Sequence, residues 1–294
     1  MEWIHANRDL FDPRCGGSSF QGAAGPEQNL REKALVELAL ALMYLRANPL
    51  LAGDPRLNDC LAFVLDVYTR PAFRDRLYRV IDVFVPYALL SIVLHACGAL
   101  QDQHERTVLQ GLIDRSNLHV SERPPHRTLE LRYLLDLGRY SHRLPSYRTL
   151  YKSSILSHPV DLVHLTDRDV YCMTHVVFYV THFGTREPGL PEPETVRILT
   201  LFEQLLGMYT YARNWDVVGE LLLSCSMLGC STTESYGLAW RALAAAQAAD
   251  GAVPGPRYDE RDAAARDVTR QRDYAFEKCY HTTLVASLAG ALCL

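Results

Sequence analysis

Residues 169–184 read "DVYCMTHVVFYVTHFG", an apolar stretch that ends in glycine and carries two histidines, His175 and His182. At about 100° per residue, the aliphatic side chains gather on one face of a helix, whereas aromatic and polar side chains gather on the other. Tyr171, His175 and His182 lie on this second face. The pattern predicts a helix that packs by its aliphatic side and presents a functional side to a cavity.

The ending of this stretch recurs along the chain. Five apolar helices are predicted to stop at a glycine, which adopts the left-handed backbone of a helix C-terminus at little cost. These glycines are Gly98, Gly138, Gly184, Gly229 and Gly290, at successive spacings of 40, 46, 45 and 61 residues. Asn48, which also tolerates that backbone, ends the first long helix and adds a sixth unit. Repeats of this length are typical of stacked helical hairpins.

Helical periodicity dominates from residue 29 onward. We expect about twelve helical segments, which begin near residues 29, 55, 76, 102, 126, 145, 165, 193, 214, 232, 260 and 278. The chain is therefore predicted to be all-α, with six helical hairpins that form an α/α toroid or, alternatively, an open α-solenoid. Residues 1–28 are predicted to be an irregular N-terminal arm, residues 251–258 a loop, and residues 29–294 a single α/α-repeat domain.

The composition narrows the functional class. The chain has 294 residues, of which 48% are hydrophobic and 22% charged, an ordinary globular profile. A net charge of −4 argues against nucleic-acid binding, which usually requires a basic face. The N-terminus lacks the pattern of a signal peptide, and the longest apolar run is short for a membrane span. Eight scattered cysteines, several within apolar helices, favour buried thiols in a cytoplasmic protein.

The glycine register places polar residues at common levels. Nine residues before three consecutive glycines lie His175, Glu220 and His281. Thirteen residues before the same glycines lie Tyr171, Asp216 and Glu277, one helical turn away on the same face. The nine-back positions of the earlier repeats are Leu89 and Leu129. The predicted polar ring is therefore one-sided, as a site would be.

These residue types suit two kinds of chemistry. His175, Glu220 and His281 have the ligand chemistry for Zn²⁺ or Fe²⁺, with open positions for water or substrate. Without a metal, the same residues could perform acid/base catalysis, because a buried carboxylate beside a histidine has a tunable pKa. In the metal site, Asp216 or Glu277 would orient an imidazole ligand. Tyr171 would donate a proton or a hydrogen bond.

Each candidate also has a purely structural interpretation. Glu220, within the apolar run "WDVVGELLLSCSML", could form an internal salt bridge to Arg132 or Arg213. Asp216 could serve the helix dipole, and His182 could be a hydrogen-bonded core histidine.

Three further features have local interpretations. A second polar line consists of Tyr87, Ser91 and His95. It either faces the cavity or, for His95, satisfies a backbone carbonyl. Thr166 and Asp167 look like N-capping residues. Cys279 lies on a different side of its helix from His281, so we leave it out of the site.

The layout resembles the α/α-toroid enzymes, among them the lanthionine cyclases and the protonating terpene cyclases. It departs from both at motif level, because "DRDV" has Val170 where the acid motif of the terpene cyclases has Asp, and "CYH" separates the Cys–His pair of the lanthionine cyclases. The pieces "YCMTHVVFYVTHFG" and "CYHTTLVASL" are similar to a family of uncharacterised actinobacterial helical proteins, which often have Asp in place of His182.

We expect a cytoplasmic bacterial enzyme of secondary metabolism that acts on a small-molecule or peptidic natural-product substrate. The reaction would be a cyclisation, lyase or hydrolytic step by acid/base chemistry, with or without Zn or Fe. The alternative is a non-catalytic helical-repeat module that binds a protein or a ligand. Neither nucleic acid nor a membrane is expected as a partner.

Overall fold

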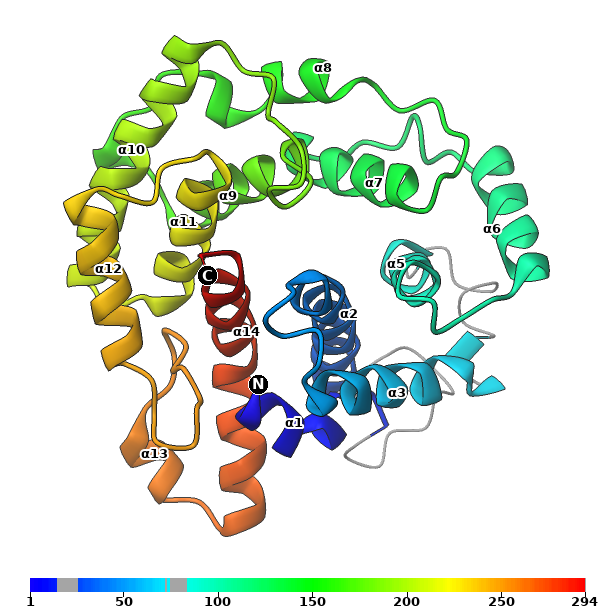
Figure 1. The fold of residues 1–294 in the computed structure, drawn as a ribbon, viewed down its shortest axis with the longest axis horizontal. Helices are drawn as coiled ribbons and strands as arrows, with labels where there is room; N and C mark the ends of the chain where they lie inside the picture. Colours follow the sequence, from blue (N-terminus) through cyan, green and yellow to red (C-terminus); the bar gives the residue numbers. More distant parts are fainter. Residues whose placement is uncertain (15–25, 72, 75–83, 294) are drawn as a thin grey trace. The chain divides into compact units, whose positions relative to one another are not determined.

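The computed structural model describes residues 1–14, 26–71, 73–74 and 84–293 (Figure 1). Every regular element within these ranges is a helix, which confirms the all-α fold class. The predicted helix near residue 76 lies outside the described residues. None of the described helices combines the length and apolar character needed to cross a membrane.

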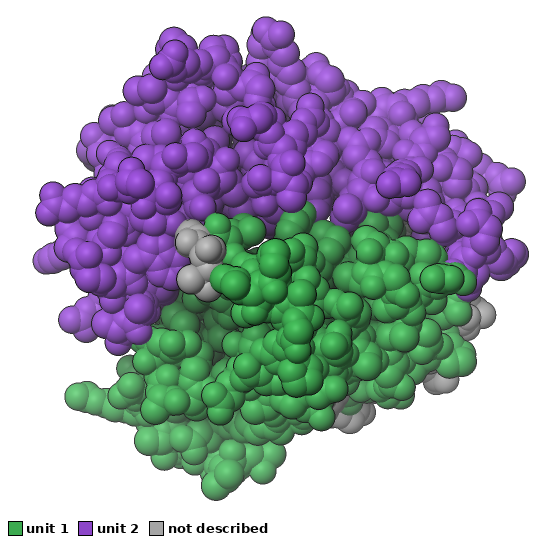
Figure 2. All heavy atoms as spheres, in the orientation of Figure 1, with its two compact units in different colours: residues 1–101, 246–292, 294 green, residues 102–245, 293 purple. Residues whose placement is uncertain are grey.

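The chain divides into two compact units (Figure 2). The single α/α-repeat domain over residues 29–294 stays a prediction. Unit 1 comprises residues 1–101, 246–292 and 294, and unit 2 comprises residues 102–245 and 293. The helices of unit 1 are α1 (Glu2–Ala6), η1 (Arg8–Phe11), α2 (Pro26–Ala47), α3 (Pro55–Thr69), α5 (Phe84–Ala96), α13 (Glu260–Ala264) and α14 (Val268–Cys293, its last residue excepted). Closure of the hairpins into a toroid stays a prediction.

The helices of unit 2 are α6 (Gln103–Arg115), α7 (Pro125–Leu137), α8 (Tyr147–Lys152), η3 (Ile155–Ser157), η4 (Leu162–His164), α9 (Asp167–Val180), α10 (Glu192–Tyr211), α11 (Trp215–Met227) and α12 (Glu234–Ala245). Of the predicted helix starts on described residues, all but the last lie within three residues of an observed start. The last, near residue 278, is wrong, because α14 begins ten residues earlier at Val268.

The core of unit 2 is built on α11. This helix is buried at every position from Asp216 to Cys225, and it packs against α9, α10 and α12. Helix α9 also packs against α7 (Figure 1). The aliphatic face predicted for α9 is fully enclosed, with Val170, Met173 and Val177 at 0% exposure. Each such side chain contributes roughly 1.5–3 kcal/mol through burial, so this packing fixes which face of α9 remains accessible.

The start of α9 is set by a capping box. The Thr166 hydroxyl accepts a hydrogen bond from the backbone N–H of Asp169, and the Asp169 carboxylate accepts one from the backbone N–H of Thr166. Thr166 is thus the predicted N-cap. Asp167 instead accepts a hydrogen bond from the Tyr209 hydroxyl at 2.8 Å, which ties α9 to α10.

The N-terminal segment departs from the predicted irregular arm. Residues 2–6 and 8–11 are helical, and Phe11 packs edge-on against Phe276 of α14 with ring centroids 4.8 Å apart. The Arg31 guanidinium lies over the same Phe276 ring and pairs with Asp273 at 3.0 Å. Such short helices have little intrinsic stability, so the tertiary contacts maintain them. The predicted loop at residues 251–258 is confirmed and packs on α14, where the N–H of Gly255 donates to the Lys278 carbonyl.

Three of the five predicted helix-ending glycines have the expected left-handed backbone. Gly98, Gly184 and Gly229 have φ angles of 71°, 82° and 77°. Gly138 does not, because its φ is −75° and the left-handed position falls one residue later, on Arg139. The prediction that a helix ends at Gly290 is also wrong, because Gly290 lies inside α14, which continues to Cys293.

The turn after α9 is unusual because three consecutive residues are left-handed. His182 and Phe183 precede Gly184 with φ angles of 47° and 54°. The N–H of Phe183 donates to the Phe178 carbonyl at 2.7 Å, and that of Arg186 donates to the Thr181 carbonyl at 2.9 Å. These bonds satisfy the carbonyl of Phe178 in the last turn of α9 and that of its C-cap residue, Thr181.

The two kinds of glycine predict opposite effects of alanine. Gly229→Ala should lower the free energy of unfolding by about 1–2 kcal/mol, because alanine is strained at a positive φ. Gly290→Ala should raise it by roughly 0.5–1 kcal/mol, because alanine favours a helix interior. An added Cβ meets no atom within 4 Å at either site, so the comparison isolates the backbone. Urea denaturation measures both, and a loss of stability in Gly290→Ala would contradict its place in a helix.

Candidate functional site

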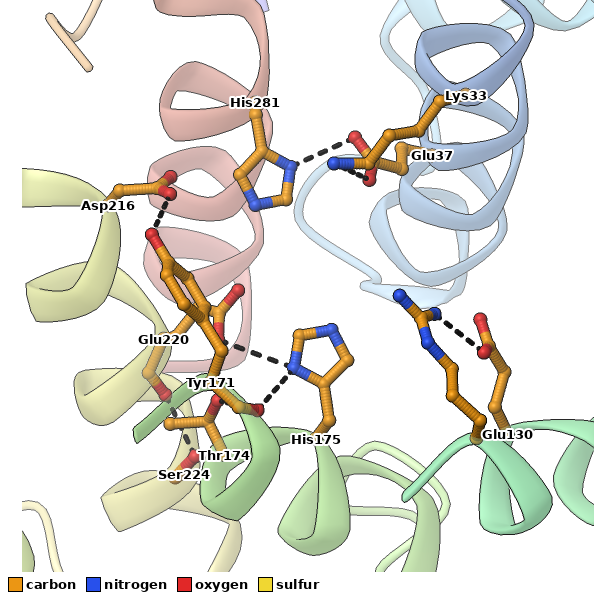
Figure 3. A network of polar contacts seen from close by, with 11 residues as sticks. Lys33, Glu37, Glu130, Tyr171, Thr174, His175, Asp216, Glu220, Ser224 and His281 are labelled. Carbon is orange, nitrogen blue, oxygen red and sulfur yellow. Dashed lines mark hydrogen bonds and ion pairs between the residues drawn. The ribbon is translucent and has the colours of Figure 1, made fainter. Parts of the chain in front are cut away.

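Four of the predicted site residues come together on two neighbouring helices of unit 2. Tyr171 and His175 lie one turn apart on α9, and Asp216 and Glu220 lie one turn apart on α11 (Figure 3). Because α9 and α11 pack against each other, each donor on α9 meets a carboxylate on α11. These four residues, which the glycine register had placed at common levels, therefore lie together in the structure.

Glu220 is the most buried group of this site, with a side chain that is 2% exposed. Its Oε2 atom accepts a hydrogen bond from the Thr174 hydroxyl and lies 3.6 Å from Nδ1 of His175. The guanidinium of Arg132, one alternative partner, is instead directed to the Leu144 and Pro145 carbonyls. A buried carboxylate requires such donors, because an unpaired one costs several kcal/mol.

The backbone of α9 selects the tautomer of His175. Its Nδ1 atom lies 2.7 Å from the carbonyl oxygen of Tyr171, which can only accept a hydrogen bond. The proton of the neutral ring is therefore on Nδ1, and Nε2 carries the lone pair. The imidazole is 25% exposed, and the described part of the chain offers Nε2 no hydrogen-bond partner. His175 can thus accept a proton from a molecule at the surface of unit 2.

Tyr171 and Asp216 form the second polar contact of the site. The Tyr171 hydroxyl donates a hydrogen bond to Oδ2 of Asp216, and Asp216 is buried, at 7% exposure. Burial, followed by the nearby Asp216 carboxylate, raises the pKa of Tyr171 far above its ordinary value. Tyr171 consequently keeps its proton and donates a hydrogen bond to Asp216. An imidazole partner for Asp216 stays a prediction.

Two neighbours of His175 were missed by sequence reasoning. Thr174 lies within the apolar run of α9, and only its contact with Glu220 marks it out. The His126 ring, at the start of α7, lies 6.4 Å from that of His175. Burial, Arg127 and His175 lower the pKa of His126 to about 4, so this imidazole is neutral at pH 7. No sequence motif links these residues, because their proximity arises from helix packing.

His182, the second histidine of the opening stretch, lies among aromatic rings at the turn after α9. Its ring centroid is 5.0 Å from that of Tyr147 and 5.3 Å from that of Tyr133. Burial lowers the pKa of His182, and its Nε2 atom is buried with no hydrogen bond to any described residue. It is therefore not the hydrogen-bonded core histidine that the structural interpretation predicts.

The remaining predicted residues lie in unit 1. His281 donates through Nδ1 to Oε2 of Glu37 on α2, at 2.9 Å, and Lys33 lies 3.4 Å from the other carboxylate oxygen (Figure 3). Glu277 pairs with the neighbouring Lys278, and its predicted orienting role stays a prediction. Cys279 is buried, in keeping with its exclusion from the site. Sequence reasoning missed Glu37, which is 244 residues from its partner.

Two further histidine and cysteine interpretations can be compared with the structure. Nδ1 of His95 lies 2.8 Å from the Ser91 carbonyl, so His95 satisfies a backbone carbonyl as one alternative predicted. The described cysteines are free thiols. Cys60 and Cys225 are buried as predicted, whereas Cys97 and Cys172, which were also predicted to be buried, are only partly buried.

The metal set His175, Glu220 and His281 stays a prediction, because its members belong to both units. Among the described residues, no group of three or more His, Cys, Asp or Glu side chains is arranged to hold a metal ion. Within unit 2, His175 and Glu220 of the predicted ligands lie 3.6 Å apart.

The Tyr171–Asp216 contact can be tested through stability. Tyr171→Phe removes a donor from a buried carboxylate, which should lower the free energy of unfolding by about 1–3 kcal/mol. The control is Tyr211→Phe, whose ring is 92% exposed and which should change stability by less than about 0.5 kcal/mol. Equal stability of the two variants in urea denaturation would argue that the contact is absent.

The Glu37 contact predicts a dependence of stability on pH. Burial alone would raise the pKa of Glu37, but His281 and Lys33 outweigh it and lower the pKa from 4.5 to about 2. The ionised Glu37 carboxylate, held by these donors, therefore stabilises the folded state above about pH 4.5, and this effect is lost as the pH falls toward 2. Glu37→Gln should be less stable than the wild type by at most about 3 kcal/mol at pH 6, and the difference should vanish near pH 2. A difference that does not depend on pH would contradict the ionised carboxylate.

The chain belongs to the family described as "Domain of unknown function (DUF6895)", whose model matches residues 1–291. Searches of curated proteins and of solved structures returned no match.

Proposed function

We propose that this member of the DUF6895 family is an enzyme whose acid/base centre is His175, with Glu220 as its buried carboxylate partner. The observation that carries this proposal is the contrast in burial between the two groups. The Glu220 carboxylate is enclosed, at 2% exposure, whereas the imidazole that it faces is open to a ligand, at 25%. At 3.6 Å from Nδ1, this carboxylate would stabilise an imidazolium through its charge, while the Nδ1 hydrogen bond goes to the Tyr171 carbonyl.

Comparison with the other imidazole–carboxylate contacts supports the choice. The His142 side chain, which contacts Asp136, is only 8% exposed and is poorly accessible. The carboxylates that contact His5 and His164 are 61% and 62% exposed, so water and salt screen them. His175 avoids both weaknesses, because its imidazole is accessible and its carboxylate is shielded from water.

The geometry assigns a role to each group. Nε2 of His175 would take a proton from the substrate, while Nδ1 remains held by the Tyr171 carbonyl and faces Glu220. Glu220 would stabilise the resulting imidazolium, which then returns the proton to the product or to solvent. Tyr171, Asp216 and Thr174 would hold the pair in place through their hydrogen bonds.

The reactions that fit this centre are a cyclisation, an elimination or a hydrolysis of a small-molecule or peptidic natural-product intermediate in a bacterial cytoplasm. All three need a proton removed from one atom and delivered to another. Zn or Fe bound by His175 and Glu220 would supply a Lewis acid. Such a site needs a third protein ligand, which would be His281 or another residue.

A second candidate function is binding without turnover. Unit 2 carries an open groove of about 590 Å³ between residues 159–163 and α10, which contributes Arg197, Thr200, Leu201 and Gln204. None of the acid/base residues lines this groove. A ligand there would favour the non-catalytic alternative. We rank it second because no imidazole lines the groove, and its Asp161 carboxylate, which contacts His164, is 62% exposed and screened by water.

The proposal is tested by incubating the protein in D₂O with a defined mixture of small peptides, esters and β-substituted carbonyl compounds. Mass spectrometry then distinguishes the reactions, since hydrolysis adds water, elimination removes a leaving group, and reversible removal of a C–H proton introduces deuterium. His175→Gln should reduce the rate by about 10²–10⁴-fold, the usual contribution of a general acid or base.

The matched control is His95→Gln, because Nδ1 of His95 makes the same bond to the carbonyl four residues earlier. It should leave the rate unchanged within a few-fold. Glu220→Gln should lie between the two, with a loss of about 10- to 100-fold, as is typical for a residue that orients a reactive imidazole. Turnover by the wild type that survives in His175→Gln would refute the assignment.

A further inference from the structure

The contact between His281 and Glu37 in unit 1 shares one feature with that of His175 in unit 2, a partly exposed imidazole beside a glutamate, although Glu37 is more exposed than Glu220. The imidazole is 27% exposed and the carboxylate 23%. In both pairs, Nδ1 faces a glutamate on a neighbouring helix and the imidazole remains accessible. The other imidazole–carboxylate contacts among the described residues lack this combination, as the comparison above shows.

Glu37 is held as an acceptor from two sides. Its Oε2 atom accepts from Nδ1 of His281 at 2.9 Å, and its Oε1 atom lies 3.4 Å from Nζ of Lys33, one turn earlier on α2. Because an ionised carboxylate can only accept hydrogen bonds, the proton of the neutral imidazole must be on Nδ1. This leaves Nε2, on the opposite edge of the ring, as the basic nitrogen.

We propose that unit 1 carries a second proton-transfer site, in which His281 exchanges a proton with the substrate and Glu37 is its positioning residue. The substrate class is a small molecule with a proton on a hydroxyl oxygen or on a carbon beside a carbonyl, because an imidazole base can remove either. Nε2 takes this proton, the imidazolium is stabilised by Glu37, and the proton passes to solvent or back to the same atom. No oxidant or further reactant enters this balance.

Unit 1 also supplies a matched control. His5 has the same exposure as His281, at 27%, and contacts Asp59 at 3.1 Å. However, the Asp59 side chain is 61% exposed, so the carboxylate is solvated and screened. If carboxylate shielding is what matters, Asp59→Asn should be silent where Glu37→Gln is not.

The experiment uses the full chain and the same substrate mixture in D₂O, so it rests on the proposed function for its readout. Glu37→Gln should lower kcat by about 10- to 100-fold with KM unchanged within about two-fold, because Glu37 acts through His281 and does not touch the substrate. Glu37→Asp should restore part of kcat, and Asp59→Asn should match the wild type. His281→Gln should lose at least as much as Glu37→Gln.

The outcomes separate the two proposals. Full kcat in Glu37→Gln and His281→Gln, with loss in His175→Gln, overturns the second site and leaves the first in place. Loss in the unit 1 variants with full activity in His175→Gln does the reverse. A parallel loss of kcat and thermal stability that Glu37→Asp does not rescue would mark the pair as structural and overturn the proposal. Absence of turnover and deuterium uptake in the wild type overturns both.

Discussion

The enclosed carboxylate of Glu220 is the constraint on which the arrangement of unit 2 depends. Helix α11 is buried over ten consecutive residues, and two of these carry carboxylates. Such groups are tolerated only where a neighbouring helix supplies donors, because their desolvation costs several kcal/mol. Helix α9 supplies them with Thr174 and His175 for Glu220 and with Tyr171 for Asp216.

This requirement fixes the rotation of α9 as firmly as its apolar face does. A slip of one residue turns a helix by about 100° and would move all three donors away from α11. The same rotation keeps Val170, Met173 and Val177 against the core. Packing and polar pairing therefore select one register together, and the contact of Nδ1 with the Tyr171 carbonyl orients the His175 ring within it.

The parts of this site that the sequence could predict are those within one helix. Tyr171 with His175, and Asp216 with Glu220, are spaced by one turn, so periodicity alone places each pair on one face. The glycine register then related the two helices correctly, because Gly184 and Gly229 both have the left-handed backbone.

The parts that could not be predicted depend on partners from distant helices or on conformation. Glu37 has no local mark, and its role follows only from its contact with His281. Gly290 resembles the other glycines in sequence, but it lies inside α14. The low helix propensity of glycine is a weak signal that tertiary packing can override. The N-terminal helices are too short to be stable or predictable on their own, and the aromatic contact of Phe11 with Phe276 stabilises them.

The backbone at His182 gives this residue a physical interpretation. Asn, Asp and His adopt positive φ more readily than most other residues. Position 182 has a φ of 47°, so a residue there must first tolerate a left-handed backbone, whatever its side chain does. Histidine shares that tolerance and adds ring contacts with Tyr133 and Tyr147. The residue at 182 is therefore explained by the turn that ends α9, whereas His175, seven residues earlier in a regular helix, has no such backbone role.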